Sequence, residues 1–499
     1  MGGQGRERRG VTRRRLLGTA AAGAAAGALP EAAQARAKRR RVPRADVVVV
    51  GAGLAGLTAA RAIRRAGRSV LVVEARRRVG GRVLNHRIAG GEISELGGEY
   101  TGPTQGRLQA LAKAVGVETF PTYASGNNVY FWGGSRSTWS DTGPTGTAPD
   151  DPLILPDLAQ VVARLNDMST AVSVEAPWTA ASAAEWDQQT LDTWLRDNSG
   201  TQRFRDLAAV ATRAIFGCEP RDLSLLYTLF YIAASGDERN VGTFERNFNT
   251  RGGAQESRFV GGSALIALRV AKDLGRAVHL GRPVGRIVQS RTGVTVEADG
   301  MTFRGRRAIV ALAPTLAGRI RFEPDLPELR DQLVQRHPMG TLIKCEAVYD
   351  RPFWRDDGLS GFAIADTGPC NVTFDNTPAD GSPAVLFGFI GGDQARQWGP
   401  RPAAQRKAAV LKNFADYFGP RALQPRDYFE GNWTQERYTR GCPVGVMQPG
   451  TLLEYGPALR PPVGRVHWAG SETSTYWNGY MDGAVRSGER AAREALAGL

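Results

Sequence analysis

Cysteine and histidine are scarce in this sequence. Four of each occur among 499 residues, widely spaced and with no C-x-x-C pair. Zinc and iron–sulfur sites draw their ligands from clustered cysteine and histidine side chains, so we expect no metal site. The spacing gives no basis for pairing the cysteines, which are Cys218, Cys345, Cys370 and Cys442.

Long apolar runs are also missing. No stretch reaches the roughly 18 apolar residues that a membrane-spanning helix needs, so we expect no membrane anchor. The weakly apolar run from Leu16 to Leu29 follows an arginine cluster and precedes Ala33-Gln34-Ala35. That order is typical of an export signal, and Arg13-Arg14 resembles a twin-arginine signal, although a basic tail is the alternative.

We therefore expect residues 1–35 to be a signal peptide for the twin-arginine export machinery and residues 36–45 to be a basic linker. The mature protein would then be periplasmic, on the cell surface or extracellular. Positive charge is concentrated in the same region, because residues 1–44 hold twelve Lys or Arg and two Glu, which is +10 of the net +15. The rest is only mildly basic, and we expect no nucleic-acid partner.

A dinucleotide-binding pattern follows this region. The run Asp46–Val50, DVVVV, predicts a buried parallel strand, and it leads into GAGLAGLTAARAIRRAG. Gly51, Gly53 and Gly56 fit G-x-G-x-x-G, in which the glycines allow a tight turn, a close approach to pyrophosphate and close helix packing. A second strand, Ser69–Val73, ends at Glu74, where a carboxylate binds an adenosine ribose.

The motifs after Glu74 carry a family resemblance. EARRRVGGRV, ELGGEYTGPTQGRL and the late stretch WAGSETSTYWNGYMDGAVRSGE resemble the flavin-containing amine oxidases, and the GPTQ form is similar to the monoamine oxidases. ESRFVGGS (256–263), RPVGRI (282–287) and GNWTQERYTRGCPVGVMQPG (431–450) follow in family order. The resemblance implies that the dinucleotide is FAD and not NAD.

The resemblance also implies the architecture, an α/β fold in which a Rossmann-like FAD-binding domain is interleaved with an α+β substrate domain. The expected FAD domain is discontinuous, over 46–120, 260–330 and 436–499, and the substrate domain takes 121–259 and 331–435. Residues 313–327 and 339–354 resemble a pair of strands crossing toward the flavin. A homodimer is a possible assembly.

The residues that the resemblance assigns to FAD form one set. They are Gly51, Gly53, Leu54, Ala55, Gly56, Glu74, Ala75, Arg76, Gly81, Arg82, Gly98, Glu99, Tyr100, Val284, Cys442, Gly470, Glu472, Gly479, Tyr480 and Met481. Arg82 is expected to face the phosphates, the Val284 backbone to hold the adenine, and the helix after Tyr480 to aim its N-terminus at the flavin, where a helix dipole favours negative charge.

The implied reaction oxidises an amine to an imine, which water converts to an aldehyde or ketone plus ammonia or an amine, while O2 becomes H2O2. Lys344 matches the family lysine that holds a water at the flavin, and Trp433 and Tyr480 match flanking aromatics. Substrate-facing positions are Gln255, Val372, Pro443 and Tyr480. Three features depart from the monoamine oxidases. GGAQE carries an extra residue, Pro443 replaces a second cage tyrosine, and Val372 stands where those enzymes have a gate aromatic or Ile.

Cys442 stands where the monoamine oxidases attach FAD through a thioether. A buried cysteine is commonly an inert apolar residue, so noncovalent FAD is favoured over the thioether.

Three alternatives remain open at this stage. An L-amino-acid oxidase needs a cation for the substrate carboxylate, for which Arg239, Arg246 and Arg251 are candidates. A polyamine oxidase needs acidic groups along its cavity. A flavin-binding protein without turnover would keep its colour when an amine is added in the absence of air.

Overall fold

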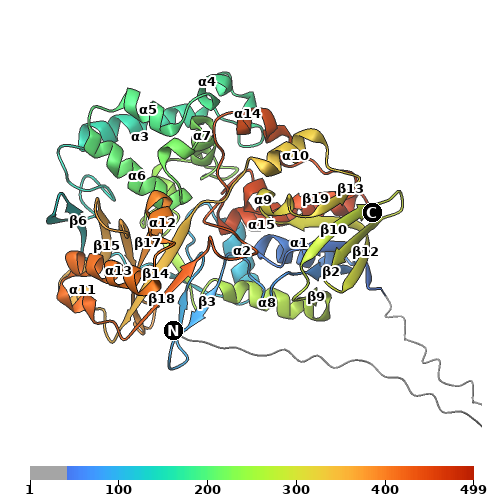
Figure 1. Ribbon diagram of the computed structural model, residues 1–499, viewed down its shortest axis with the longest axis horizontal. Helices are drawn as coiled ribbons and strands as arrows, with labels where there is room; N and C mark the ends of the chain where they lie inside the picture. The colour runs from blue at the N-terminus through green and yellow to red at the C-terminus, as the bar shows by residue number, and fades with distance from the viewer. Residues whose placement is uncertain (1–41) are drawn as a thin grey trace, which may run out of the picture. The chain divides into compact units, whose positions relative to one another are not determined.

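Two β-sheets, each covered by helices, organise residues 42–499, which are the residues that this computed structural model describes (Figure 1). The expected signal peptide, residues 1–35, lies outside the described residues, as does most of the expected linker. The first strand begins at Arg44, two residues before the predicted strand.

The larger sheet has eight strands in the order β13-β10-β11-β12-β1-β2-β9, with β19 paired to β12. Its strands are β1 (Arg44–Val50), β2 (Val70–Val73), β9 (Val278–His279), β10 (Val284–Gln289), β11 (Val294–Ala298), β12 (Met301–Ala311), β13 (Arg321–Glu323) and β19 (Val466–Ala469). β1 is central and parallel to both β2 and β12.

The valines of β1 explain this central position. Val47 and Val49 pack into a core that includes residues of helices, whereas Val48 and Val50 pack on the opposite face, with residues of β10 to β12. A strand buried on both faces reads as a continuous apolar run, which is why DVVVV predicted it. The helices next to this sheet are α1 (Leu54–Arg65), α2 (Gly106–Ala114), α8 (Ala264–Leu274), α9 (Pro314–Ala317) and α15 (Met481–Ala497).

Close backbone approach sets the start of α1. A Cβ at Gly56 would lie 2.0 Å from the carbonyl oxygen of Gly51, so only glycine allows the helix to begin directly over the turn. Along the same helix, a Cβ at Gly488 of α15 would lie 2.3 Å from the carbonyl oxygen of Ala55. α1 and α15 therefore pack closely and bring the two ends of the described chain together.

The second sheet has seven strands in the order β18-β14-β17-β16-β15-β6-β7. They are β6 (Asn127–Trp132), β7 (Ser135–Trp139), β14 (Leu342–Tyr349), β15 (Leu359–Ala365), β16 (Val372–Asp375), β17 (Ala384–Gly391) and β18 (Asp427–Asn432). Two small sheets pair β3 (Asn85–Arg87) with β4 (Ile93–Glu95) and β5 (Thr119–Pro121) with β8 (Ser257–Phe259).

The expectation that 313–327 and 339–354 form a strand pair is wrong. β13 pairs with β10 in the larger sheet, and β14 pairs with β17 and β18 in the other. The two segments are joined through α10 (Glu328–Gln335), so the chain leaves one sheet and enters the next between them. Adjacent apolar runs in a sequence do not reveal which sheet completes their hydrogen bonds.

A second group of helices packs beside the seven-stranded sheet. α3, α5, α6 and α7 share one apolar core, and α7 is buried along its whole length. The helices are α3 (Leu155–Thr170), α4 (Ala183–Asp187), α5 (Leu191–Asn198), α6 (Gln202–Phe216), α7 (Leu225–Ala233), α11 (Phe353–Asp356), α12 (Gly392–Trp398), α13 (Ala403–Phe418) and α14 (Thr451–Tyr455). α13 packs on the seven-stranded sheet.

The α/β fold class expected from the sequence is confirmed, whereas the domain boundaries stay a prediction. All strands of the eight-stranded sheet fall in 46–120, 260–330 and 436–499 apart from the first two residues of β1. None of the helices in the described residues has the length and apolarity to cross a bilayer.

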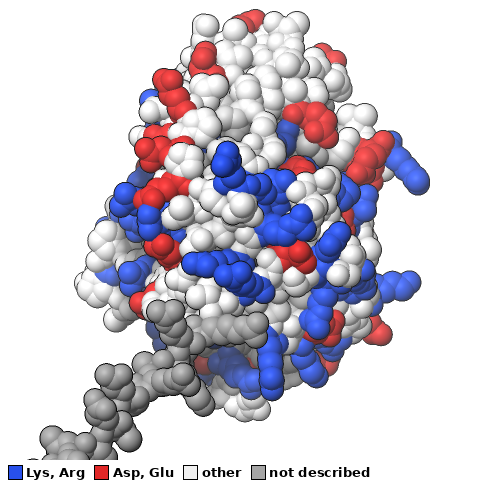
Figure 2. Space-filling model, turned by 90° about the vertical axis from the view of Figure 1, so that its right-hand side faces the viewer, with Lys and Arg blue, Asp and Glu red and all other residues white. Residues whose placement is uncertain are grey.

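Figure 2 shows Lys and Arg side chains interleaved with acidic ones on the face at the right of Figure 1. Several arginines of the eight-stranded sheet form ion pairs. Arg286 binds Glu297 and Glu323, and Arg321 also binds Glu323. Ion pairing of this kind reduces the net field that a row of arginines would otherwise produce.

Candidate active site

A cavity of about 810 Å³ extends from the end of β1 to the helices α3, α5 and α6. Every residue that the family resemblance assigns to FAD, to the substrate or to catalysis lines it, except Gly56 and Glu472. Gly56 lies under the turn, for the packing reason given above, and Glu472 is fully buried behind Arg82. The structure therefore brings residues from distant parts of the chain to one cavity.

The turn from β1 to α1 forms one end of the cavity. Gly51 has φ +101°, and a Cβ there would lie 2.8 Å from the carbonyl oxygen of Ala311, so the turn requires glycine. A Cβ at Gly53 would meet nothing nearer than the Cα of Gly81, at 4.0 Å, which leaves open space beside the backbone. The first N–H groups of α1 face this space with no side chain from Gly53 to cap them, as a phosphate-binding helix N-terminus requires.

Glu74 lies at the same end of the cavity and binds two backbone N–H groups there. Its carboxylate accepts hydrogen bonds from the backbone N–H of Ala52 (2.7 Å) and of Arg76 (2.8 Å), and it is 5% exposed. A carboxylate has about four lone-pair sites, so two remain for ribose hydroxyl groups. The open glycine turn, the exposed helix N-terminus and this carboxylate fit an adenine dinucleotide.

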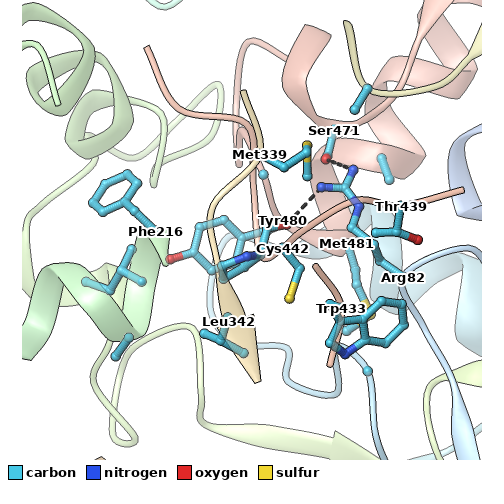
Figure 3. A pocket seen from close by; sticks show the side chains of 18 of the residues that line it. Arg82, Phe216, Met339, Leu342, Trp433, Thr439, Cys442, Ser471, Tyr480 and Met481 are labelled. Atoms are coloured by element: carbon cyan, nitrogen blue, oxygen red, sulfur yellow. Dashed lines mark hydrogen bonds between the residues drawn. The ribbon is translucent and has the colours of Figure 1, made fainter. Parts of the chain in front are cut away.

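Arg82 is held by Glu472 and by Ser471, and Figure 3 shows Arg82 beside Ser471. Its guanidinium lies 2.5 and 3.0 Å from the two Glu472 oxygens and donates to Ser471 Oγ (2.9 Å) and to the Pro443 carbonyl (2.8 Å). We expected this cation to face the phosphates. The structure shows that its terminal nitrogens bind Glu472, Ser471 and Pro443 while the side chain lines the cavity.

Glu472 is ionised as a result. Burial would raise the pKa of its carboxyl group, but the charge and hydrogen bonds of Arg82, together with His337, lower that pKa to about 2. The pair ties the WAGSET stretch to the GGR loop, 390 residues apart. Both loops line the cavity through Arg82, Gly470 and Ser471.

Lys344 lies in β14, a strand that is buried along its whole length, and is 2% exposed. Its ammonium donates to Glu99 Oε2 (2.9 Å) and to the Glu95 carbonyl, and lies 4.1 Å from the centre of the Phe387 ring. The resemblance implied that Lys344 holds a water at the flavin, and burying its charge without a partner is costly. Glu99 supplies the compensation within the protein, while Lys344 still lines the cavity.

Trp433, Cys442 and Tyr480 surround the middle of the cavity (Figure 3). The Trp433 indole N–H donates to the Leu96 carbonyl (3.1 Å), which fixes the ring. The Cys442 side chain packs with Leu342 and Trp433. Burial raises the pKa of its thiol to about 12, against the opposing charge of Arg82.

Tyr480 is fixed at both ends. Its hydroxyl donates to the Asn247 carbonyl (2.9 Å), and its ring meets Trp477 edge to face at 4.8 Å and Tyr231 at 5.7 Å. Burial raises the pKa of the Tyr480 hydroxyl, so it stays neutral. Pro443 also lines the cavity, and it is not aromatic.

The far end of the cavity is apolar. Its wall comes mainly from α3, α5 and α6, and among its lining residues between 147 and 255 in the described chain there is no Lys, Arg, Asp or Glu. These side chains include Leu158, Val161, Val162, Leu165, Leu191, Leu195, Phe204, Leu207, Val210, Ile215, Phe216, Phe244 and Phe248. Val372 of β16 lines the same cavity.

Gln255 supplies a polar group at this end. Its Oε1 is buried and has no hydrogen-bond partner among the described residues, although the residue lines the cavity. The three arginines considered as carboxylate ligands do not line the cavity. Arg251 binds Asp141 and the Ala124 carbonyl, and Arg246 binds the Val241 carbonyl.

Sequence reasoning missed most of the apolar wall. α3 and α6 are ordinary amphipathic helices, and no motif distinguishes a helix face that lines a cavity from one that packs in a core. It also missed Met339, Leu342, Thr439 and Ser471, which Figure 3 shows at the pocket. Leu342 lies in TLIKC and Met339 lies two residues before it. Their closeness to Lys344 in the sequence was the only signal that could have identified them.

No cluster of three metal-ligating side chains occurs within residues 42–499. All four cysteines are buried and free.

The chain matches known proteins over most of its length. Residues 54–496 match the family model of flavin-containing amine oxidoreductases. A Mycobacterium tuberculosis protein, provisionally named flavin-containing monoamine oxidase AofH, is 42% identical over 91% of this chain and 96% of its own length. Bovine flavin-containing amine oxidase A is 36% identical over 91% of this chain and 85% of its own length.

Among solved structures, cyclohexylamine oxidase from Brevibacterium oxydans superposes with a TM-score of 0.86 at 35% identity, over 92% of this chain and 100% of its own.

Proposed function

The chain belongs to the family of flavin-containing amine oxidoreductases, and from that premise we propose that its substrates are hydrophobic monoamines. It is an FAD-dependent amine oxidase, as the family model and the relatives named above show. The expectations of oxidoreductase activity, an FAD cofactor and an amine substrate are therefore confirmed. The class of amine is the new part.

The observation that carries this proposal is the uncharged wall between 147 and 255. A polyamine keeps a second ammonium group, which would need a carboxylate at that wall, and an amino acid would need a cation for its carboxylate. The cavity instead offers aliphatic and aromatic side chains. It also holds one unpaired amide oxygen, on Gln255, which can accept a hydrogen bond from an amine N–H.

The apolar wall also prepares the amine chemically. An ammonium ion loses its hydration in such a site, so burial lowers the amine pKa and favours the neutral form that can be oxidised. Tyr480 and Trp433 restrict the orientation of the bound amine, because each ring is fixed by a hydrogen bond. Bound FAD would supply the hydride acceptor and the route by which the electrons reach O2.

The protein's own groups have assigned roles in this proposal. Glu74 and the N-terminus of α1 hold the dinucleotide, and the Arg82–Glu472 pair fixes the loops around it. Lys344, which lines the cavity, assists the reaction with O2 through its ammonium group. FAD is held noncovalently, because a thiol with a raised pKa supplies little of the thiolate that a thioether bond requires.

Export by the twin-arginine route is also part of the proposal, and its support is the order of charge, apolar run and small-residue site within residues 1–35. Replacing Arg13-Arg14 with two lysines should leave the protein in the cytoplasm with FAD bound. Secretion of that variant at the normal level would rule the route out. Assembly as a homodimer rests on the resemblance, and light scattering on the mature protein tests it.

A substrate panel tests the class of amine. Peroxide release should be fastest with cyclohexylamine and aryl-alkyl amines and slow with putrescine, spermidine and L-leucine. The Brevibacterium neighbour named as a cyclohexylamine oxidase supports this order. A preference for spermidine or for L-leucine would overturn the proposal.

A further inference from the structure

Five charged side chains form a buried cluster behind the centre of the cavity. Glu346 and Lys344 leave β14 on one face, two residues apart, and Glu95, Glu99 and Arg258 reach them from β4, the loop after it and β8. All five are between 0% and 3% exposed. Three carboxylates facing two cations would leave one net negative charge buried in the protein, which is costly.

The three carboxylates are not equally stabilised as anions. Glu95 accepts two bonds from Arg258 (2.7 and 3.2 Å) and one from the Ser263 N–H (2.8 Å). Burial raises the pKa of Glu95, and these three bonds oppose the shift. Glu99 accepts from Lys344 at 2.9 Å.

The anionic form of Glu346 is the least stabilised of the three. Its Oε2 accepts from Ser94 Oγ, which in turn accepts from Asn376 Nδ2 (3.0 Å). Its Oε1 has no hydrogen bond among the described residues and lies 3.5 Å from Lys344 Nζ. A single proton on Glu346 would make the cluster neutral and would leave Lys344 paired with Glu99.

The surroundings of Glu346 agree with this assignment. Burial raises its pKa to about 7 and Glu99 adds to the rise, while Lys344 and the Ser94 hydroxyl oppose it. The remaining members of the cluster are Glu95 and Arg258, and Tyr100 is a titratable group next to it. Burial and Glu99 also raise the pKa of Tyr100, so that group stays neutral.

We propose that Glu346 is a positioning residue that holds a proton in reserve for Lys344, which donates into the cavity when O2 is reduced. This inference rests on the proposed role of Lys344 in the reaction with O2. Lys344 is the member of the pair that lines the cavity, and Glu346 acts only through it.

The proton balance requires such a donor. Reduction of O2 to H2O2 takes two electrons and two protons. The hydride removed from the amine supplies both electrons and one proton, so one more proton must arrive. An N–H bond of Lys344 breaks to give it, and the O–H bond of Glu346 then breaks to restore the ammonium. Glu346 is left as a carboxylate and regains its proton from solvent before the next turnover.

Stopped-flow reoxidation of the amine-reduced holoenzyme tests the proposal. In the unaltered protein the reoxidation rate should fall as pH rises through about 7, because the reserve proton is lost. In Glu346→Gln it should be lower by about 10²-fold at acidic pH and should not change with pH in this range. Reduction by amine without air should proceed at the normal rate.

A second variant keeps the test decisive if Glu346→Gln fails to fold. Ser94→Ala removes the hydroxyl donor that favours the Glu346 carboxylate, so the midpoint of the reoxidation profile should move to higher pH. Asp187→Asn is the matched control. Asp187 is a buried carboxylate bound to Ser224 and to the Leu453 N–H, and it does not line the cavity. Its profile should match the unaltered protein.

Infrared spectra provide a readout that does not depend on turnover. A protonated carboxyl band should fade as pH rises through about 7 and should be missing in Glu346→Gln. A normal pH profile in both Glu346→Gln and Ser94→Ala would overturn the inference. Failure of a monoamine to reduce the flavin without air would count instead against the proposed substrate class.

Discussion

Arg82 and Glu472 form a two-point ion pair, with N–O distances of 2.5 and 3.0 Å, between loops 390 residues apart in the sequence. The Glu472 side chain is fully buried. Such a pair holds the two loops in one arrangement, because separating them would leave a buried charge without a partner.

Glu472→Gln should therefore destabilise the protein by about 3 kcal/mol at neutral pH, since it removes one partner of a buried pair. The measurement is urea unfolding of the apoprotein. Glu436→Gln is the control, because Glu436 pairs with Arg76 at the surface, with its side chain 49% exposed. Equal losses in the two variants would contradict a special role for the buried pair.

The same pair predicts a loss of stability at acidic pH. The pKa of Glu472 is lowered to about 2 from an ordinary value of 4.5, so its contribution to stability is fully present above about 4.5. That contribution is lost as pH falls from 4.5 toward 2, because the unfolded chain binds the proton more readily. Unfolding of the unaltered protein and of Glu472→Gln across this range should show a smaller loss in the variant, and parallel curves would disprove the assignment.

Glu74→Ala should weaken FAD binding by about tenfold or more, because the ribose loses its acceptor and the N–H groups of Ala52 and Arg76 lose theirs. Titration of the apoprotein with FAD, followed by flavin fluorescence, gives the dissociation constant. Glu74→Gln keeps the size of the side chain and should retain part of the affinity. Full occupancy of Glu74→Ala at low FAD would contradict this role.

Lys344→Met should leave FAD bound and slow the reaction of the reduced enzyme with O2. The methionine cannot donate a hydrogen bond, while the groups around the dinucleotide are unchanged. Stopped-flow reoxidation at several O2 concentrations measures the effect. An unchanged rate constant for the reaction of the reduced enzyme with O2 would contradict the role assigned to Lys344. We also expect a lower Tm, because Glu99 loses its cation.

FAD should be released when the protein is precipitated with acid, because the Cys442 thiol stays protonated in its buried position. The yellow colour should appear in the supernatant for both the unaltered protein and Cys442→Ala. Colour that stays in the pellet of the unaltered protein and is lost in Cys442→Ala would establish the thioether. The amine oxidase assignment is independent of this result.

The sequence was informative where function depends on neighbouring residues. The strand, turn and helix around Gly51, Gly53 and Gly56, and Glu74 at the end of the next strand, form one local unit that reads directly from the chain. The family resemblance rested on such contiguous stretches. It therefore predicted the FAD cofactor, which the family match confirms, and a set of binding residues, nearly all of which line one cavity.

Lys344 and Glu346 show where this information ends. Their spacing in TLIKCEAVY places both side chains on one face of a strand, which the period of two determines. The sequence could not show that Glu95, Glu99 and Arg258 meet them, because those residues arrive from other strands and loops.

By itself, then, the sequence determined the fold class, the dinucleotide turn and the cofactor, since each depends on local pattern. Tertiary structure alone decided that Glu472 lies behind Arg82 and outside the cavity, that α3 and α6 give an uncharged wall, and that β13 and β14 belong to different sheets. These features depend on which surfaces pack together after distant segments meet. Packing selects partners by shape, burial and charge over the whole chain, and no short stretch of residues carries that information.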